Sequence, residues 1–340
     1  MLDRFTKIRI ILVLCLLSII HCPVYAQTTE METCYRELAA RFDGRDKQLQ
    51  RDLKEYLQAF PYTTFADEVK FMQGVLQVEK GHYKQGLKYL ETVDTHALSR
   101  AHQTDYLFFR GYAYLMMQEF QRASIYFGQL SKGNSRYKVR GTYYYAYCMY
   151  KLERYDKALP ALEALENEPE YAKTVPYYIT QIHYAQGNYD VAEMRANELL
   201  EAYPDSPNNA ELHRILGEMS YRKQDYRATV DHLELYVQAA KANKEEPVRN
   251  DLFMLGMAQY RLAHYNEAVT ALKQMKQEPD TLSEAACLTM GNAYVQLNMP
   301  EQAKLSYQAA ASYGITPAIK EEAAYNYTLC TYQSFSALGE

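Results

Sequence analysis

Tryptophan is absent from the 340 residues, and glycine and proline are scarce, with 14 and 11 occurrences. So few turn-forming residues argue against a fold of many short strands joined by tight turns. No charge of one sign dominates either, because 37 basic residues stand against 42 acidic ones. The basic stripe that a nucleic-acid backbone requires is missing. We therefore expect no nucleic-acid partner.

Motifs of catalysis and metal binding are also missing. The sequence has no glycine-rich phosphate loop, no Gly-x-Ser-x-Gly elbow, no His-Glu-x-x-His helix and no Cys-x-x-Cys pair. The histidines are dispersed, and His82 and His264 fall in predicted turns, where exposed residues are expected. Adjacent carboxylates such as Glu245 and Glu246 point apart on a helix. We expect no enzyme activity, no cofactor and no bound metal.

Long apolar runs are absent except near the N-terminus, where residues 10–20 are apolar apart from Ser18. Three basic residues precede this run: Arg4, Lys7 and Arg9. The run is too short to span a bilayer, which takes about 20 residues, so we expect no transmembrane span in the mature chain. Val24 and Ala26 place small residues before a cleavage site at Gln27. The sequence thus predicts a signal peptide over residues 1–26 and export of the protein.

Lipoprotein processing at Cys22 is the alternative, but His21 stands where a small residue is required. Removal of residues 1–26 takes away one acidic and three basic residues, which leaves 41 against 34 and a net charge of −7. The mature chain is then mildly acidic.

Tyrosine is abundant, with 34 occurrences, and many of them belong to a repeated pattern. A polar turn, an aromatic residue and two further residues precede a small residue, as in residues 153–158. These small residues are separated by 37, 35, 34, 37, 39 and 35 positions: Gly86, Ala123, Ala158, Ala192, Thr229, Ala268 and Ala303. Twelve positions earlier stands another small residue, with Thr180 as the exception: Gly74, Gly111, Ala146, Gly217, Gly256 and Gly291.

This pattern resembles the tetratricopeptide-repeat (TPR) motif, in which small residues at positions 8 and 20 of a 34-residue unit let two antiparallel helices approach closely. The resemblance covers residues 33–340. It implies an all-α fold, namely a right-handed superhelical solenoid of antiparallel helix pairs. Residues 252–260 and 268–275 support helices independently, because their apolar residues recur at three- and four-residue spacing.

The repeat also predicts the organisation of the chain. After the signal peptide we expect a degenerate N-terminal repeat or cap over residues 27–66, with residues 53–60 as its second helix. Seven TPR units follow over residues 67–319, and residues 320–340 form the first helix of an incomplete unit. A half repeat leaves an apolar face uncovered. We therefore expect a longer array beyond residue 340, the alternative being a lone terminal helix that serves as a cap.

Four cysteines remain in the predicted mature chain: Cys34, Cys148, Cys287 and Cys330. Export into an oxidising compartment raises the question of disulfides. Residues more than one repeat apart do not touch in a solenoid, and only Cys287 and Cys330 lie in neighbouring repeats. We expect buried free thiols.

The resemblance also implies a binding surface. In TPR proteins the first helix of each unit lines the concave face through motif positions 2, 5, 9 and 12. Here aromatic rings and two arginines occupy many of these positions: Phe71, Phe108, Tyr112, Arg140, Tyr143, Tyr147, Tyr150, Tyr177, Tyr184, Arg214, Tyr221, Phe253 and Tyr260. Such rings offer large contact area at small entropic cost, for an extended peptide or a sugar ring. The alternative is that these tyrosines only fill space between helices.

Together these features predict a non-catalytic scaffold or adaptor that binds a protein or peptide partner through an aromatic concave groove. It is similar to exported TPR proteins of Gram-negative bacteria, which implies the periplasm or the periplasmic face of the outer membrane. Chaperone-binding TPRs place Lys, Asn and Arg where this chain mostly places Tyr, so a chaperone tail is not expected. The alternative function is a glycan- or peptidoglycan-binding module that uses the tyrosine row.

Overall fold

The computed structural model describes residues 28–44, 46 and 48–337, so the predicted signal peptide and Cys22 lie outside the described residues. Within the described ranges every regular element is a helix, and no strand occurs. The predicted all-α fold is confirmed.

Two helices open the described chain, one over residues 28–43 and α2 over Leu49–Ala59. Leu49 and Leu53 of α2 are fully buried in the core that also contains α3. The ring of Tyr35 stacks on Phe65 at 3.9 Å, just before α3 begins. This pair of helices occupies the region where a degenerate repeat is predicted.

Seven helix pairs follow in the described part of the chain, and in each pair the odd-numbered helix packs against the even-numbered one. The pairs are α3 (Ala66–Glu79) with α4 (Tyr83–Leu90), α5 (Arg100–Met116) with α6 (Phe120–Lys132), α7 (Lys138–Lys151) with α8 (Tyr155–Glu163), α9 (Val175–Ala185) with α10 (Tyr189–Ala202), α11 (Asn209–Arg222) with α12 (Tyr226–Ala242), α13 (Arg249–Arg261) with α14 (Tyr265–Gln274), and α15 (Thr281–Gln296) with α16 (Pro300–Tyr313). Short 3₁₀ turns, η1 (Thr95–Ala97) and η2 (Pro169–Tyr171), precede α5 and α9.

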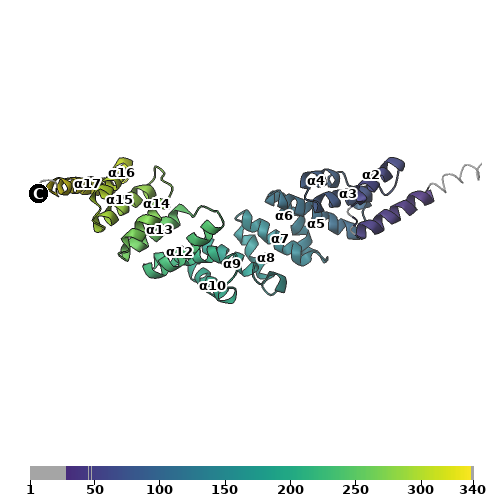
Figure 1. Cartoon of the computed structure of the whole chain (residues 1–340). Coiled ribbons are helices and arrows are strands. Elements are labelled where there is room, and N and C mark those ends of the chain that lie inside the picture. Colours follow the sequence, from purple (N-terminus) through teal and green to yellow (C-terminus); the bar gives the residue numbers. More distant parts are fainter. Residues whose placement is uncertain (1–27, 45, 47, 338–340) are drawn as a thin grey trace, which may run out of the picture. The chain divides into compact units, whose positions relative to one another are not determined.

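A single helix, α17 (Pro317–Ala337), packs on α16, and no partner helix follows it among the described residues. The chain divides into two compact units, an N-terminal unit through Leu165 and a C-terminal unit from Glu166 onward. Within each unit the helices succeed one another in chain order (Figure 1). Each unit is a helical-repeat solenoid.

Close approach within the pairs requires the small residues of the repeat. A Cβ atom added to Gly217 on α11 would lie 2.5 Å from the side chain of Leu233 on α12. One added to Gly256 on α13 would meet Leu272 of α14 at the same distance. Real Cβ atoms do not come this close to carbon atoms, so a larger side chain would force the helices apart.

The turn inside each pair has a left-handed residue. Over the described residues all seven of these turns contain one backbone φ between 55° and 80°: Gly81, Gln118, Glu153, Gly187, Gln224, Ala263 and Asn298. At the end of α5, for example, Gln118 N–H donates to the Leu115 carbonyl and Glu119 N–H to that of Tyr114. These bonds satisfy the last carbonyls of the helix and reverse the chain.

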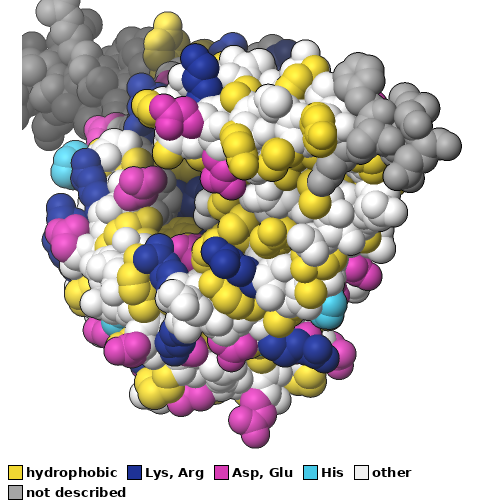
Figure 2. Space-filling model, turned by 90° about the vertical axis from the view of Figure 1, so that its left-hand side faces the viewer, with side chains coloured by type: hydrophobic (Ala, Val, Ile, Leu, Met, Phe, Trp, Pro, Cys, Tyr) yellow, Lys and Arg dark blue, Asp and Glu magenta, His cyan; other side chains and the backbone are white. Residues whose placement is uncertain are grey.

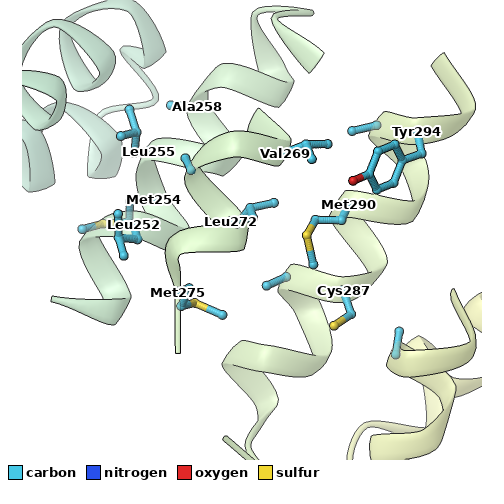
Figure 3. Close-up of a cluster of buried hydrophobic side chains, with 14 of the residues drawn as sticks. Leu252, Met254, Leu255, Ala258, Val269, Leu272, Met275, Cys287, Met290 and Tyr294 are labelled. Carbon is cyan, nitrogen blue, oxygen red and sulfur yellow. The ribbon is translucent and has the colours of Figure 1, made fainter. Parts of the chain in front are cut away.

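The apolar core of the C-terminal unit runs continuously through α12 to α17. Figure 3 shows Leu255 of α13, Leu272 of α14 and Met290 of α15 at its centre. Leu272 is fully buried and Leu255 is 5% exposed, because each helix contributes apolar residues at helical spacing to the layers on both sides.

Buried carboxylates connect one pair to the next. Glu284 on α15 accepts backbone N–H bonds from Ile315 at 2.9 Å and from Thr316 at 3.0 Å, just before α17 begins. In the N-terminal unit Glu68 on α3 accepts from Ser99 N–H at 2.6 Å, just before α5 begins. Each acid therefore holds the backbone that immediately precedes the next first helix and connects that helix to the preceding pair.

Candidate functional site

A groove of about 650 Å³ opens in the N-terminal unit. Helices α3, α5 and α7, the turn after α3 and the first residue of α4 contribute its lining: Leu76, Val78, Glu79, Lys80, Tyr83, Phe108, Phe109, Tyr112, Arg140 and Tyr144. Half of these residues are aromatic. The volume falls in the range of ligand pockets, about 300–1,000 Å³.

Stacked rings form the floor of this groove. The ring of Phe108 lies 4.2 Å from that of Tyr137, nearly parallel at 12°, and only 8% of Phe108 is exposed. Tyr112 lies 6.1 Å from both Phe108 and Tyr144, and Tyr144 lies 5.0 Å from the buried ring of Phe127. Because these rings brace one another, little side-chain freedom remains to be lost when a ligand binds.

Charged residues stand among the lining. Glu79 and Lys80 come from the end of α3, and Arg140 stands exposed at the start of α7. Two cations and one anion beside an aromatic floor can orient a ligand that carries both apolar and polar groups.

The structure places the predicted site residues of the N-terminal unit in two different environments. Phe108, Tyr112 and Arg140 line the groove. Phe71 does not, because its ring is fully buried between Phe42, 6.0 Å away, and His102, 4.7 Å away. The helix of residues 28–43 and α5 enclose it from two sides, so Phe71 belongs to the core and not to a binding surface.

On α7 the predicted residues Tyr143, Tyr147 and Tyr150 are half-buried and do not line this groove. Tyr147 makes an edge contact with Phe120 at 6.1 Å, and Tyr150 lies 6.2 Å from Tyr155. The sequence prediction missed seven of the ten groove residues: Leu76, Val78, Glu79, Lys80, Tyr83, Phe109 and Tyr144. All of them except Val78 lie outside motif positions 2, 5, 9 and 12, and the run of three tyrosines at 143–145 was the one signal for Tyr144.

In the C-terminal unit the predicted residues are charged as well as aromatic. Arg214 on α11 donates to Glu211 through Nε at 2.9 Å and through Nη2 at 2.6 Å. Its guanidinium lies 5.4 Å from the centre of the Tyr184 ring, and Tyr184 donates its hydroxyl hydrogen to Glu218. Burial opposes the charge on Arg214, but the bonds and charge of Glu211 and the charge of Asp251 outweigh it and raise the pKa of Arg214.

Asp251 on α13 lies beside this network and is 1% exposed. Its Oδ2 atom accepts no hydrogen bond, and the nearest cation, Nη1 of Arg214, is 3.9 Å away. Burial raises the pKa of Asp251 to about 6, although the charge of Arg214 acts to lower it. This carboxyl therefore lacks the backbone donors that satisfy Glu284 and Glu68.

Four of the predicted tyrosines pack on the tyrosine that begins the next helix, five residues on. The ring pairs are 5.6–6.2 Å apart: Tyr150 with Tyr155, Tyr184 with Tyr189, Tyr221 with Tyr226, and Tyr260 with Tyr265. Tyr177 similarly contacts Tyr178 at 5.3 Å, and half-buried Phe253 packs against the core. The space-filling role that the sequence left open thus accounts for part of the tyrosine row.

Three exposed residues on α17 continue the same motif positions beyond the predicted set. Tyr325 is 65% exposed, Leu329 42% and Tyr332 74%. A shift of 37 residues aligns α17 with α15, because Ala286 and Ala293 then coincide with Ala323 and Cys330, all of them buried. Figure 2 faces the end of the molecule that carries α17 and shows hydrophobic side chains at its surface.

The four cysteines of the described ranges are free thiols, with Cys148, Cys287 and Cys330 buried and Cys34 half-buried. Burial raises the pKa of Cys148 to about 12, which leaves it a poor nucleophile at neutral pH. Across residues 28–337, apart from the two undescribed positions, none of the helices is long and apolar enough to cross a membrane.

The chain matches known repeat families. Residues 5–251 match the family described as Iml2/Tetratricopeptide repeat protein 39, and residues 252–281 match a tetratricopeptide-repeat family. No curated protein matches the chain.

Solved structures of low sequence identity are similar to it. A tetratricopeptide repeat protein from Parabacteroides merdae is 15% identical over 76% of this chain and 98% of its own, with a TM-score of 0.47. The apo form of RapI is 14% identical over 92% of this chain and 98% of its own, with a TM-score of 0.48. YrrB, described as a TPR protein with an unusual peptide-binding site, is 16% identical over 58% of this chain and 97% of its own, with a TM-score of 0.46.

Proposed function

The chain belongs to the Iml2/Tetratricopeptide repeat protein 39 family, whose repeat fold is that of a protein-interaction scaffold, and from this premise we propose a specific way of binding. The protein is a non-catalytic adaptor that holds an extended segment of a partner protein in the aromatic groove of its N-terminal unit. The observation that carries this proposal is the braced aromatic floor around Phe108 and Tyr112, in a groove of about 650 Å³.

The chemistry of the groove suits a peptide. Apolar side chains of the partner gain contact with the rings of Tyr112 and Tyr144, whose hydroxyls offer hydrogen bonds. Backbone and charged groups of the partner find Glu79, Lys80 and Arg140 beside the same rings. Binding sites of this kind concentrate their energy in a few aromatic and arginine side chains.

Location is the second part of the proposal. The predicted signal peptide over residues 1–26 supports export, and we place the adaptor in the periplasm or at the periplasmic face of the outer membrane. N-terminal sequencing of the protein purified from its native cells tests this. A mature chain that begins at Gln27 supports export, whereas a chain that retains Met1 and Leu2 contradicts it.

A photo-crosslinking amino acid at position 112 tests the groove. The matched control carries the same group in place of Ile125, which is 55% exposed on α6 and does not line the groove. We expect one recurrent protein to be captured from position 112 and not from position 125. Equal capture from both positions, or none from position 112, contradicts the groove proposal.

Once that partner is purified, Tyr112→Ala gives the strength of the contact. Truncation of an aromatic residue that anchors an interface costs about 2 kcal/mol or more, which corresponds to roughly thirtyfold weaker binding. The control Ile125→Ala should bind as tightly as the wild type. Circular dichroism of both variants checks that the helices remain folded.

A further inference from the structure

Two histidines that lie nineteen residues apart in sequence meet in the C-terminal unit. His213 on α11 and His232 on α12 place their Nδ1 atoms 3.0 Å apart. The ring centroids are 5.3 Å apart and the planes are inclined by 31°. Both side chains are half-buried, so the pair borders solvent.

We propose that His213 and His232 form a binding site for a divalent transition-metal ion, chelated by the two Nδ1 atoms. Metal–imidazole bonds are about 2.0–2.1 Å long. Two nitrogens bound to one ion at roughly 90–110° are therefore about 2.9–3.4 Å apart. The observed separation of 3.0 Å falls in this range.

The protonation of the pair favours binding. Burial lowers the pKa of both histidines, and the charge of His232 lowers that of His213 further. Burial thus favours the neutral form of both rings, and each Nδ1 of a neutral ring can offer a lone pair if its proton resides on Nε2. Without the ion, one Nδ1–H donates to the other Nδ1. Binding moves that proton to Nε2 of the same ring, so no net proton is released.

The surrounding charge also favours a cation. Asp225 and Asp231 are the charged groups that act on His232, and both raise its pKa, which opposes the effect of burial. Asp225 is held in place because it accepts a bond from Ala228 N–H at 3.0 Å. Negative charge that stabilises a protonated imidazole also stabilises a metal ion at the same place.

The two helices that hold the pair are closely packed. The two histidines flank the contact at which Gly217 of α11 lies against Leu233 of α12. No group of three or more His, Cys, Asp or Glu residues that could hold a metal occurs in the described ranges, so the protein supplies two ligands. Water completes the coordination. Imidazole ligands suit zinc, copper and nickel, and the bound ion would fasten α11 to α12.

Calorimetric titration of the purified chain with ZnCl₂ tests the site. We expect saturable uptake that weakens at least tenfold in His213→Gln and in His232→Gln, because each variant replaces chelation by a single ligand. His264→Gln serves as the matched control, because His264 also contacts a side chain through Nδ1, that of Gln259 at 2.9 Å, but has no second imidazole beside it. Cys34→Ser controls for uptake by the half-buried thiol.

Imidazole nitrogen NMR of the wild-type chain keeps the test independent of how the variants fold. Zinc should shift the Nδ1 resonances of His213 and His232 together and leave those of His264 in place. Unchanged Nδ1 resonances, or equal uptake by the wild type and both histidine variants, would overturn the proposal and leave the pair as a hydrogen bond between neutral rings.

Discussion

Helices α3 and α17 are each the first helix of a repeat, and each carries an aromatic residue at the same motif position. The environments of these two rings are opposite. Phe71 on α3 is fully buried, whereas Tyr325 on α17 is 65% exposed. Phe42 and His102 approach the ring of Phe71 from neighbouring helices on two sides. No helix pair follows α17 among the described residues. A position in the repeat therefore does not decide whether a ring can meet a ligand, because the neighbours on both sides decide it.

Truncation of the two rings should show most clearly that the same motif position has different roles in α3 and α17. Phe71→Ala leaves a cavity in the core, and we expect it to lower the free energy of unfolding by about 3–5 kcal/mol. Tyr325→Ala removes an exposed ring, so its effect should stay within about 0.5 kcal/mol. Urea unfolding followed by circular dichroism measures both. Losses of equal size would show that α17 is covered as completely as α3.

Weakening the hydrogen bonds that attach α17 to Glu284 should have the next largest effect on stability. Glu284 is buried, and burial acts to raise its pKa, but hydrogen bonds from Thr316 and Ile315 outweigh burial and lower it. Glu284→Gln removes the charge from these bonds, which should cost about 1.5–3 kcal/mol. Hydrogen exchange of the α17 amides measures where the loss falls. Unchanged exchange in α17 would contradict a role for Glu284 in attaching this helix.

Wild-type stability should depend on pH through the same carboxylate. The pKa of Glu284 is lower in the folded chain, so its contribution is present above the ordinary glutamate pKa, about 4.3. That contribution should be lost as the pH falls through the folded value. The variant Glu284→Gln should lack this part of the pH profile.

The pKa of Asp251 is shifted in the opposite direction to that of Glu284, so its contribution to stability should depend on pH in the opposite way. Its pKa is raised to about 6 by burial, so the folded chain favours the protonated form. The stability from this preference is complete below the ordinary aspartate pKa, about 3.9, and is lost as the pH rises toward 6. Asp251→Asn should therefore stabilise the protein at pH 7 by about 1–2 kcal/mol and have little effect at pH 4. A gain that does not change with pH would contradict this assignment.

The sequence predicted the fold because the small residues have a direct steric meaning. Only a small side chain at Gly217 or Gly256 lets the two helices of a pair come so close, so their spacing reports the pairing itself. The groove was predicted in part, since Phe108 and Tyr112 line it but Phe71 does not. Burial of a ring depends on the rotation of each helix and on its neighbours, neither of which a repeat pattern contains.

The histidine pair, too, could not be predicted from the sequence alone. His213 and His232 meet because α11 and α12 reverse the chain between them, and their nineteen-residue separation matches no local metal motif. Asp251 could not be distinguished from Glu284 in sequence, because both are acidic residues near the start of a first helix. Only the positions of the nearby backbone N–H groups separate them.

The turns inside the helix pairs are the feature in which the repeats are most alike. Substitutions in these turns should have the smallest effect on stability. Ala263 has a backbone φ of 63°, which costs a residue with a Cβ about 1–2 kcal/mol. Ala263→Gly removes this strain but increases the freedom of the unfolded chain, so we expect a net gain of about 0.5 kcal/mol. The reciprocal change, Gly187→Ala, should lose a similar amount.

A Cβ at Gly187 would meet no atom within 4 Å, so that loss would come from its φ of 79° and not from crowding. Thermal unfolding of Ala263→Gly and of Gly187→Ala measures both changes in stability. Loss of stability in Ala263→Gly would mean that the alanine methyl makes contacts worth more than the strain, and the seven turns would then not be equivalent in energy, although they share one backbone shape.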